Sequence, residues 1–153
     1  MMQETRRNKP GSNRAILVGV LVVIAVGGFH VYRSRGAPTP PGWREDVEPA
    51  LNEAKLDNKP VLVDFVASWC GPCQQMMRNV LPNSKVVEAM DGFVTVKVDV
   101  DQYSDLANEH EVQYLPTFVV LDGQGREVHR FTGYHDVDDF LLQIAAARKR
   151  LAA

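Results

Sequence analysis

Residues 61–73, with the sequence VLVDFVASWCGPC, decide the fold of this 153-residue chain. The first seven are almost all apolar and rich in β-branched side chains, a pattern typical of a short strand buried on both faces of a sheet. A helix should begin near Cys70, because Pro72 is tolerated in a first helical turn, where its missing N–H has no helical partner. Asp64 is the only charge in the strand. It is therefore a candidate functional carboxylate, the alternative being a strand-edge residue that reaches solvent.

The two cysteines are predicted to act as a redox pair. Cys70 lies where free backbone N–H groups and the helix dipole stabilise a thiolate, so we expect it to be the exposed nucleophile. Cys73 lies one turn inward, close enough for a disulfide, and is expected to be the resolving thiol. Asp64, its pKa raised by desolvation, is the candidate acceptor of the Cys73 proton, through a water molecule.

Other roles for the cysteine pair are disfavoured. A structural disulfide that closes so small a ring would remove little chain entropy. A zinc site needs further ligands, but the chain has no second cysteine pair and no His-x-x-x-His. Haem attachment needs a histidine directly after Cys73, where the sequence has Gln74. We expect Met76 in the core and Met77 at its rim. Three histidines have no shared spacing in the sequence and are expected at the surface: His110, His129 and His135.

The sequence around this segment predicts a mixed α/β fold. Val47, Leu51 and Ala54 recur at helical spacing, and the run from 93 to 100 alternates as a strand does. Asp136 is the expected cap of the last helix. The other elements follow from the same patterns: helices over 44–57, 84–90 and 103–111, and strands over 117–121 and 126–131 joined by the turn 122–125. The order α-β-α-β-α-β-β-α implies a mixed sheet with helices on both faces.

The net charge of −2 is the sum of two unlike parts. Residues 1–41 hold six basic residues against one acidic, a charge of +5, and residues 42–153 hold eleven against eighteen, a charge of −7. An acidic domain disfavours nucleic acid as a partner, because phosphate binding needs a basic face.

Residues 15–32 are predicted to anchor the chain in a membrane. They contain no Asp, Glu, Lys or Arg, and as a helix they would reach about 27 Å, close to the ~30 Å hydrocarbon core. More Lys and Arg precede the segment than follow it closely, so we expect the basic residues 1–14 in the cytoplasm and the rest outside. The alternative is a signal peptide, with residues 1–28 cleaved. Residues 33–42 are rich in Pro and Gly and form the expected linker to a domain over 43–153.

The segment VLVDFVASWCGPC resembles the active-site segment of the thioredoxin family. Lys97-Val98-Asp99 resembles the strand that supplies a lysine near the buried aspartate, Leu115-Pro116-Thr117 resembles the cis-proline loop, and Gly133 resembles the glycine that borders the substrate groove. The resemblance covers nearly all of residues 43–145 and implies a three-layer thioredoxin-like sandwich. The front end, with Trp43 and Asn58-Lys59-Pro60, is most similar to the exported, membrane-tethered branch, such as the C-terminal periplasmic domain of thiol:disulfide interchange proteins. In that branch the fold starts with a helix.

The resemblance implies a thiol:disulfide oxidoreductase, as a protein-disulfide reductase on the periplasmic side of the inner membrane. It implies Cys70 as nucleophile, Cys73 as resolving cysteine and Asp64 as proton acceptor. Lys97 is given a supporting role, the alternative being a solvated lysine. The implied substrate surface consists of Trp69, Gly71, Pro72, Leu115, Pro116 and Gly133.

We expect the cysteine pair to be the only redox group, with no separate cofactor and no metal, and the protein to be a monomer. The expected partners are protein disulfides or thiols, such as apocytochrome c or another thioredoxin-like carrier, and a membrane electron donor. Two alternatives remain open. One is a disulfide oxidase or isomerase of the same fold, and the other is a tethered thioredoxin-like module that binds without turnover.

Overall fold

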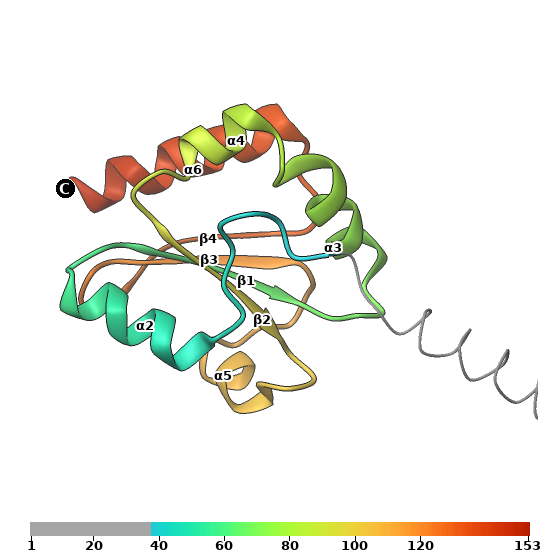
Figure 1. Ribbon diagram of the computed structural model, residues 1–153, viewed down its shortest axis with the longest axis horizontal. Helices are drawn as coiled ribbons and strands as arrows, with labels where there is room; N and C mark the ends of the chain where they lie inside the picture. Colours follow the sequence, from blue (N-terminus) through green and yellow to red (C-terminus); the bar gives the residue numbers. More distant parts are fainter. Residues whose placement is uncertain (1–37) are drawn as a thin grey trace, which may run out of the picture. The chain divides into compact units, whose positions relative to one another are not determined.

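Four strands form one mixed sheet in the order β2-β1-β3-β4 (Figure 1). The strands are β1 (Val61–Val66), β2 (Val94–Asp99), β3 (Thr117–Leu121) and β4 (Glu127–Thr132). β1 is parallel to β2 and antiparallel to β3, and β3 is antiparallel to β4. The predicted mixed sheet is confirmed, and the 61–73 segment supplies its central strand, with all six residues of β1 buried.

The computed structural model describes residues 38–153. The predicted anchor, residues 15–32, and the basic residues 1–14 lie outside them, as does half of the linker, residues 33–37. Within residues 38–153, no helix has the length and apolar character needed to cross a bilayer.

Helices cover both faces of the sheet, which makes a three-layer sandwich (Figure 1). One face carries α2 (Val47–Leu56) and α5 (Ser104–Glu109), and the other carries four helical segments. These are α3 (Gly71–Gln75), the π-helical turn η1 (Met76–Val80), α4 (Ser84–Ala89) and α6 (Val137–Leu151). The helix expected over 44–57 begins only at Val47, because Arg44 forms a β-bridge with Val96 of β2.

The alternation of β1 separates two hydrophobic cores. Val61, Val63 and Phe65 pack toward α2 and α5, whereas Leu62 and Val66 pack toward α3, η1 and α6. The second of these cores contains three phenylalanines in contact. The rings of Phe118 and Phe131 stack at 4.8 Å, and the ring of Phe140 meets them edge-on at 5.3 and 5.5 Å. Asp64 lies on the same face as this core.

Local polar contacts set the ends of several elements as the sequence predicts. The Asp136 carboxylate accepts the N–H of Asp139 at 2.9 Å and caps α6. The Asp122 carboxylate accepts the N–H groups of Gln124 and Arg126, both at 2.9 Å, and closes the β3–β4 hairpin. Both contacts satisfy backbone donors that have no partner in the ladder or helix.

Two predictions about single side chains are wrong. Met77, expected at the rim, is buried, because a π-helical turn changes the angular spacing of residues and brings both methionines inward. His129, expected at the surface, is buried between β4 and α6. Its Nε2 lies 2.9 Å from Gln143 Oε1 and its Nδ1 lies 2.6 Å from Arg150 Nη1, so the imidazole has a polar partner at each nitrogen.

Candidate active site

Cys70 and Cys73 form a disulfide at the start of α3. Cys70 is the N-cap residue, and its Sγ accepts the backbone N–H of Cys73 at 3.2 Å. Gly71 and Pro72 occupy the first helical turn and are exposed. A sulfur in this position accepts a backbone N–H at the positive end of the helix dipole. When the disulfide is reduced, this position favours a thiolate over a thiol.

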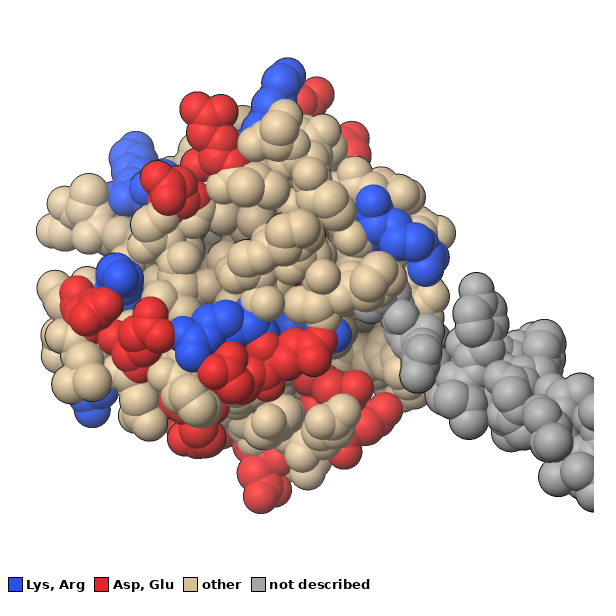
Figure 2. Space-filling model, viewed as in Figure 1, with Lys and Arg blue, Asp and Glu red and all other residues tan. Residues whose placement is uncertain are grey.

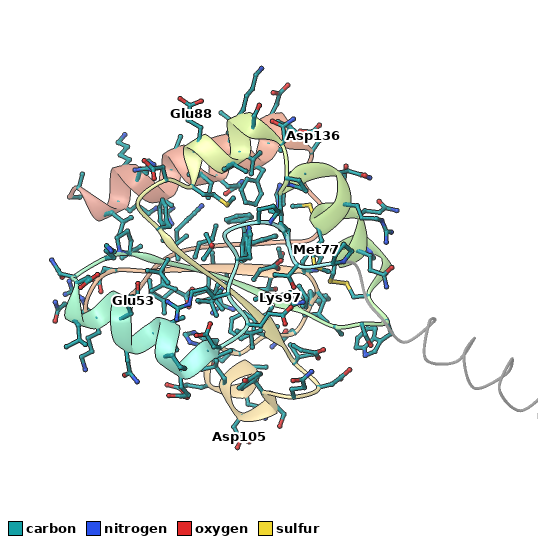
Figure 3. All side chains as sticks on the ribbon, in the orientation of Figure 1. Glu53, Met77, Glu88, Lys97, Asp105 and Asp136 are labelled. Carbon is teal, nitrogen blue, oxygen red and sulfur yellow. A yellow bond between two sulfur atoms is a disulfide. The ribbon has the colours of Figure 1, made fainter. Side chains whose placement is uncertain are left out.

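The two sulfur-bearing residues differ less in exposure than predicted. Cys70 is 5% exposed and Cys73 is fully buried. The expected openly exposed nucleophile is therefore not found in the disulfide form, because both residues pack into the core between the sheet and α3. Cys70 is still the more accessible of the two cysteines, and Trp69 beside it is 69% exposed. In Figure 3 the disulfide lies at the α3 side of the domain, near Met77 of the same core.

Asp64 is buried in the centre of the sheet and is 1% exposed. Neither carboxylate oxygen has a hydrogen-bond partner among residues 38–153. Burial raises the pKa of the Asp64 carboxyl well above its ordinary value, and the positive charge of Lys97 offsets only part of that rise. The alternative of a strand-edge residue that reaches solvent is wrong, because β1 is paired on both sides. A carboxyl in this environment binds a proton more tightly than one in water.

Lys97 is the register partner of Asp64 on β2, but its ammonium group bonds elsewhere. Its Nζ donates to Glu45 Oε1 at 2.6 Å and to Thr39 Oγ1 at 2.7 Å. The side chain is 19% exposed, so Lys97 is not the freely solvated residue of the alternative prediction. The face of β2 expected to be polar is covered by the stretch 38–46, and Thr95 on that face is also buried.

The loops at residues 115–117 and 133–135 are brought together. The Leu115–Pro116 peptide bond is cis, as the resemblance implied. The N–H of Gly133 donates to the Pro116 carbonyl at 2.8 Å, and the positive φ of Gly133, 84°, is a conformation that favours glycine. The N–H of His135 then contacts Met76 Sδ at 3.4 Å, which ties this turn to η1.

A hollow of about 280 Å³ lies between Trp69 and the loop before Pro116. The Trp69 indole N–H donates to the Asp101 carboxylate at 3.0 Å, which orients the ring at the edge of this hollow. The wall is formed by side chains of α5 and of the segments flanking it: Trp69, Val100, Ser104, Ala107, Asn108, Val112, Gln113 and Leu115. This surface suits an extended segment with apolar side chains.

The sequence patterns did not single out several exposed residues that contact or directly adjoin the predicted substrate residues. Asp101 is one, and two exposed tyrosines are the others: Tyr114 is 70% exposed and Tyr134 is 48% exposed. Each tyrosine directly neighbours a predicted substrate residue, Leu115 or Gly133, and that adjacency is the signal that would have identified them. Asp101 had no comparable signal, since its partner Trp69 is 32 residues away.

Charge is unevenly spread around the site. On the face in Figure 2, acidic side chains gather around α5, and basic side chains lie beside acidic ones across the middle of the domain. The second feature agrees with the ion pairs of the stretch before α2, Arg44–Asp46, Arg44–Glu53 and Lys97–Glu45. Within residues 38–153, no cluster of three or more His, Cys, Asp or Glu side chains is placed to hold a metal ion.

Comparison with known proteins relates the whole domain to one family. A family model described as a thioredoxin-like domain matches residues 47–148. A chloroplastic thioredoxin Y from Oryza sativa subsp. japonica is 39% identical over 89 residues, 58% of this chain and 51% of the relative. An H-type thioredoxin from Fagopyrum esculentum is 37% identical over 103 residues, 67% of this chain and 81% of the relative. The aligned region thus spans about half of the first relative's length and about four-fifths of the second's.

Solved structures show the same similarity. A thioredoxin from Thermus thermophilus superposes with a TM-score of 0.65 at 30% identity, covering 72% of this chain and 89% of that one. The reduced C-terminal domain of DsbD from Neisseria meningitidis gives a TM-score of 0.59 at 25% identity, covering 67% of this chain and 94% of that one.

Proposed function

Because the chain belongs to the thioredoxin-like family, we propose that it is a protein-disulfide reductase that works outside the cytoplasmic membrane. Its cysteine pair and its thioredoxin relatives support thiol–disulfide oxidoreductase chemistry, and proteins of this family use a redox-active disulfide and no separate cofactor. The direction of exchange and the tether formed by residues 15–32 are the proposed parts.

The observation that carries the proposal is the Cys70–Cys73 disulfide, with Cys70, 5% exposed, at the helix start and Cys73, fully buried, a turn later. This asymmetry assigns the order of the two steps. In the reduced protein, the Cys70 thiolate attacks a disulfide of the partner, forms a mixed disulfide and releases one partner thiolate, which takes a proton from solvent. Cys73 has no route to the partner and attacks second.

Asp64 makes the second step possible. Cys73 must lose a proton where solvent does not reach, and a carboxylate with a raised pKa on the same face of the sheet is suited to accept it through a water molecule. The Cys73 thiolate then attacks the Cys70 sulfur of the mixed disulfide. The second partner sulfur leaves as a thiolate and takes a proton from solvent, two electrons have passed to the partner, and Cys70–Cys73 is oxidised.

The hollow beside Trp69 and the Pro116 loop form the proposed docking surface. Leu115 takes no part in the sheet ladder, which begins at Thr117, so its backbone N–H and C=O are candidates to pair with an extended substrate segment. Trp69, Gly71, Pro72 and Gly133 would border that segment.

The Gly71-Pro72 dipeptide together with a buried aspartate resembles the reducing members of the family. An exported reductase needs electrons from across the membrane, so the proposal includes a membrane donor that reduces Cys70–Cys73 after each cycle. Proposed clients are apocytochrome c, other exported thiol proteins or a downstream thioredoxin-like carrier.

Replacing Cys73 with serine tests whether the site turns over. The Cys73→Ser variant should accumulate mixed disulfides through Cys70, detected as bands that disappear on reduction, because the resolving step has been removed. The matched control is Cys70→Ser, which should trap nothing. A variant lacking both cysteines that still retains its partners would instead identify a binding module without turnover.

A further inference from the structure

The stretch Thr39–Glu45, which precedes α2, is fixed along the outer edge of β2 (Figure 1). The Arg44 N–H donates to the Thr95 carbonyl at 2.9 Å, and the Arg44 carbonyl accepts the Lys97 N–H at 2.8 Å. Thr95 Oγ1 donates to the Gly42 carbonyl at 2.9 Å. These bonds set the direction of the side chains. Arg44 bonds Glu53 of α2 on one side of the sheet, so its neighbours Trp43 and Glu45 lie on the other.

Trp43 packs on the face of the sheet that carries Asp64. It is 7% exposed and belongs to the same core as Leu62, Val66 and Cys73. Leu62 and Val66 flank Asp64 at the alternate positions of β1, so all three side chains leave the strand on that face. Trp43 therefore lies on the same face of the sheet as the carboxylate, in the core that contains the two residues flanking it.

Trp43 and Asp64 have complementary unpaired atoms. Among the buried side-chain nitrogens and oxygens of residues 38–153, Trp43 Nε1 and the two Asp64 oxygens are those without a hydrogen-bond partner. The indole N–H only donates, and an ionised carboxylate only accepts. Buried polar groups are nearly always paired, either with protein or with an ordered water that bridges them.

Lys97 does not fill this role. Its ammonium group donates to Glu45 and Thr39, so its charge is largely balanced within the Thr39–Glu45 stretch. Figure 3 places Lys97 in the middle of the domain, over the sheet. These bonds weaken, but do not remove, the effect of the Lys97 charge on the pKa of Asp64.

We propose that Trp43 is a positioning residue for Asp64, its indole N–H linked to the carboxylate through a buried water, while Glu45 binds the Lys97 ammonium group and weakens its effect on Asp64. The inference rests on the proposed function, in which Asp64 accepts the Cys73 proton. Trp43 then stabilises the ionised form of Asp64, and Glu45 reduces the stabilisation that the Lys97 charge gives it.

The surroundings of Asp64 contain few other groups that titrate or carry charge. Lys97 and Asp99 lie on its face of β2, and Glu45 lies on the covering stretch. From β3 its register partner is Phe118, which does not titrate. The α3 side contributes Cys70 and Cys73, which do not titrate while they are joined in the disulfide.

The test is a titration of the Asp64 carboxyl carbon by ¹³C NMR in the oxidised full-length chain. In Trp43→Phe the midpoint should move upward by about one pH unit, the size that a hydrogen bond to a charged group supports. In Glu45→Gln it should move downward, because the field of Lys97 is no longer balanced. The matched control is Trp69→Phe, which removes an indole N–H that bonds Asp101 instead, and it should leave the midpoint in place.

Opposite shifts in the Trp43 and Glu45 variants support the inference, because general damage to the fold would not produce shifts of opposite sign. An unmoved midpoint in Trp43→Phe, or an upward one in Glu45→Gln, would overturn it. If Trp43→Phe does not fold, an NMR titration of the unsubstituted chain still tests the inference. Its Trp43 indole ¹H–¹⁵N resonance should titrate with the Asp64 midpoint and lose that step in Asp64→Asn, and a resonance that does not titrate would overturn the inference.

These midpoints are measured without turnover, so they separate the two claims. Opposite shifts in a protein that reduces no disulfide would leave the Trp43 link intact and remove the proposed function. Efficient disulfide reduction with unmoved midpoints would remove this inference alone.

Discussion

Replacing Asp64 with asparagine should change the way in which the free energy of unfolding depends on pH. Burial raises the pKa of the Asp64 carboxyl in the folded protein well above its ordinary value. In the unfolded chain the same group titrates near about 3.9. Between these two values the folded protein keeps a proton that the unfolded chain has lost, so the free energy of unfolding falls as pH rises. Asparagine does not titrate and should not show this loss.

The size of the effect follows from one proton. The difference in free energy of unfolding between Asp64→Asn and the unsubstituted protein should grow in favour of the variant from about pH 4 upward, by at most about 1.4 kcal/mol per pH unit. It should become constant once pH exceeds the folded pKa. The buried amide itself costs about 1–3 kcal/mol if it is unpaired, but this offset does not depend on pH and leaves the slope unchanged.

The assay is urea unfolding of the oxidised proteins at successive pH values from 4 upward, with the disulfide intact. Asp105→Asn is the control, because Asp105 is exposed on α5, and its stability curve should run parallel to that of the unsubstituted protein. Parallel curves for Asp64→Asn as well would contradict a raised pKa of Asp64, because they would mean that this carboxyl is as well solvated in the folded state as in the unfolded one.

Four further outcomes are expected. Asp64→Asn should slow resolution of the mixed disulfide by roughly a hundredfold at pH 7, measured by stopped-flow with a model disulfide, and an unchanged rate would exclude Asp64 as the proton acceptor. Phe118→Ala should lower the free energy of unfolding by about 3–5 kcal/mol, because the fully buried ring contacts two others; a loss under 1 kcal/mol would contradict that packing. Asp136→Ala should cost about 1 kcal/mol through loss of the α6 cap, with Asp136→Ser as the matched variant that restores it. Cys70 should react with a membrane-impermeant thiol reagent in intact cells after mild reduction, and labelling only after lysis would contradict the proposed topology.

The strand and the cysteine pair could be predicted because their signals are local. Apart from Asp64, VLVDFVA is apolar, and a segment with that composition is most stable as a strand between two layers. Pro72 after Cys70 marks a helix start by its own geometry. The hairpin turn at residues 122–125 and the cap at Asp136 are equally local.

The features that the sequence did not predict depend on contacts between distant residues. The burial of Thr95 comes from Gly42, 53 positions away, and the position of the Lys97 ammonium group comes from Glu45, 52 positions away. A polar residue on an alternating strand is solvated or buried depending on which other segment packs on that face. The alternation of the strand itself does not indicate whether such a segment is present. His129 was missed for the same reason, because its partners Gln143 and Arg150 lie on a later helix.

The burial of Cys70 also could not be predicted without the three-dimensional fold. A cap position predicts a backbone N–H at the sulfur, and that bond is present. It does not predict how closely the surrounding core encloses the same atom. Cys70 therefore has the expected backbone N–H at its sulfur but is less exposed to solvent than expected. A substrate would have to reach it from the hollow beside Trp69.

Whether the Cys70–Cys73 pair reduces protein disulfides is decided by the reduction potential of this pair. Equilibration of the protein against glutathione or dithiothreitol buffers, with the oxidised fraction read by thiol alkylation, gives the value. For a reductase we expect a potential of about −270 mV, in the range of reducing thioredoxins. A value near about −120 mV, in the range of a strong oxidant, would contradict it.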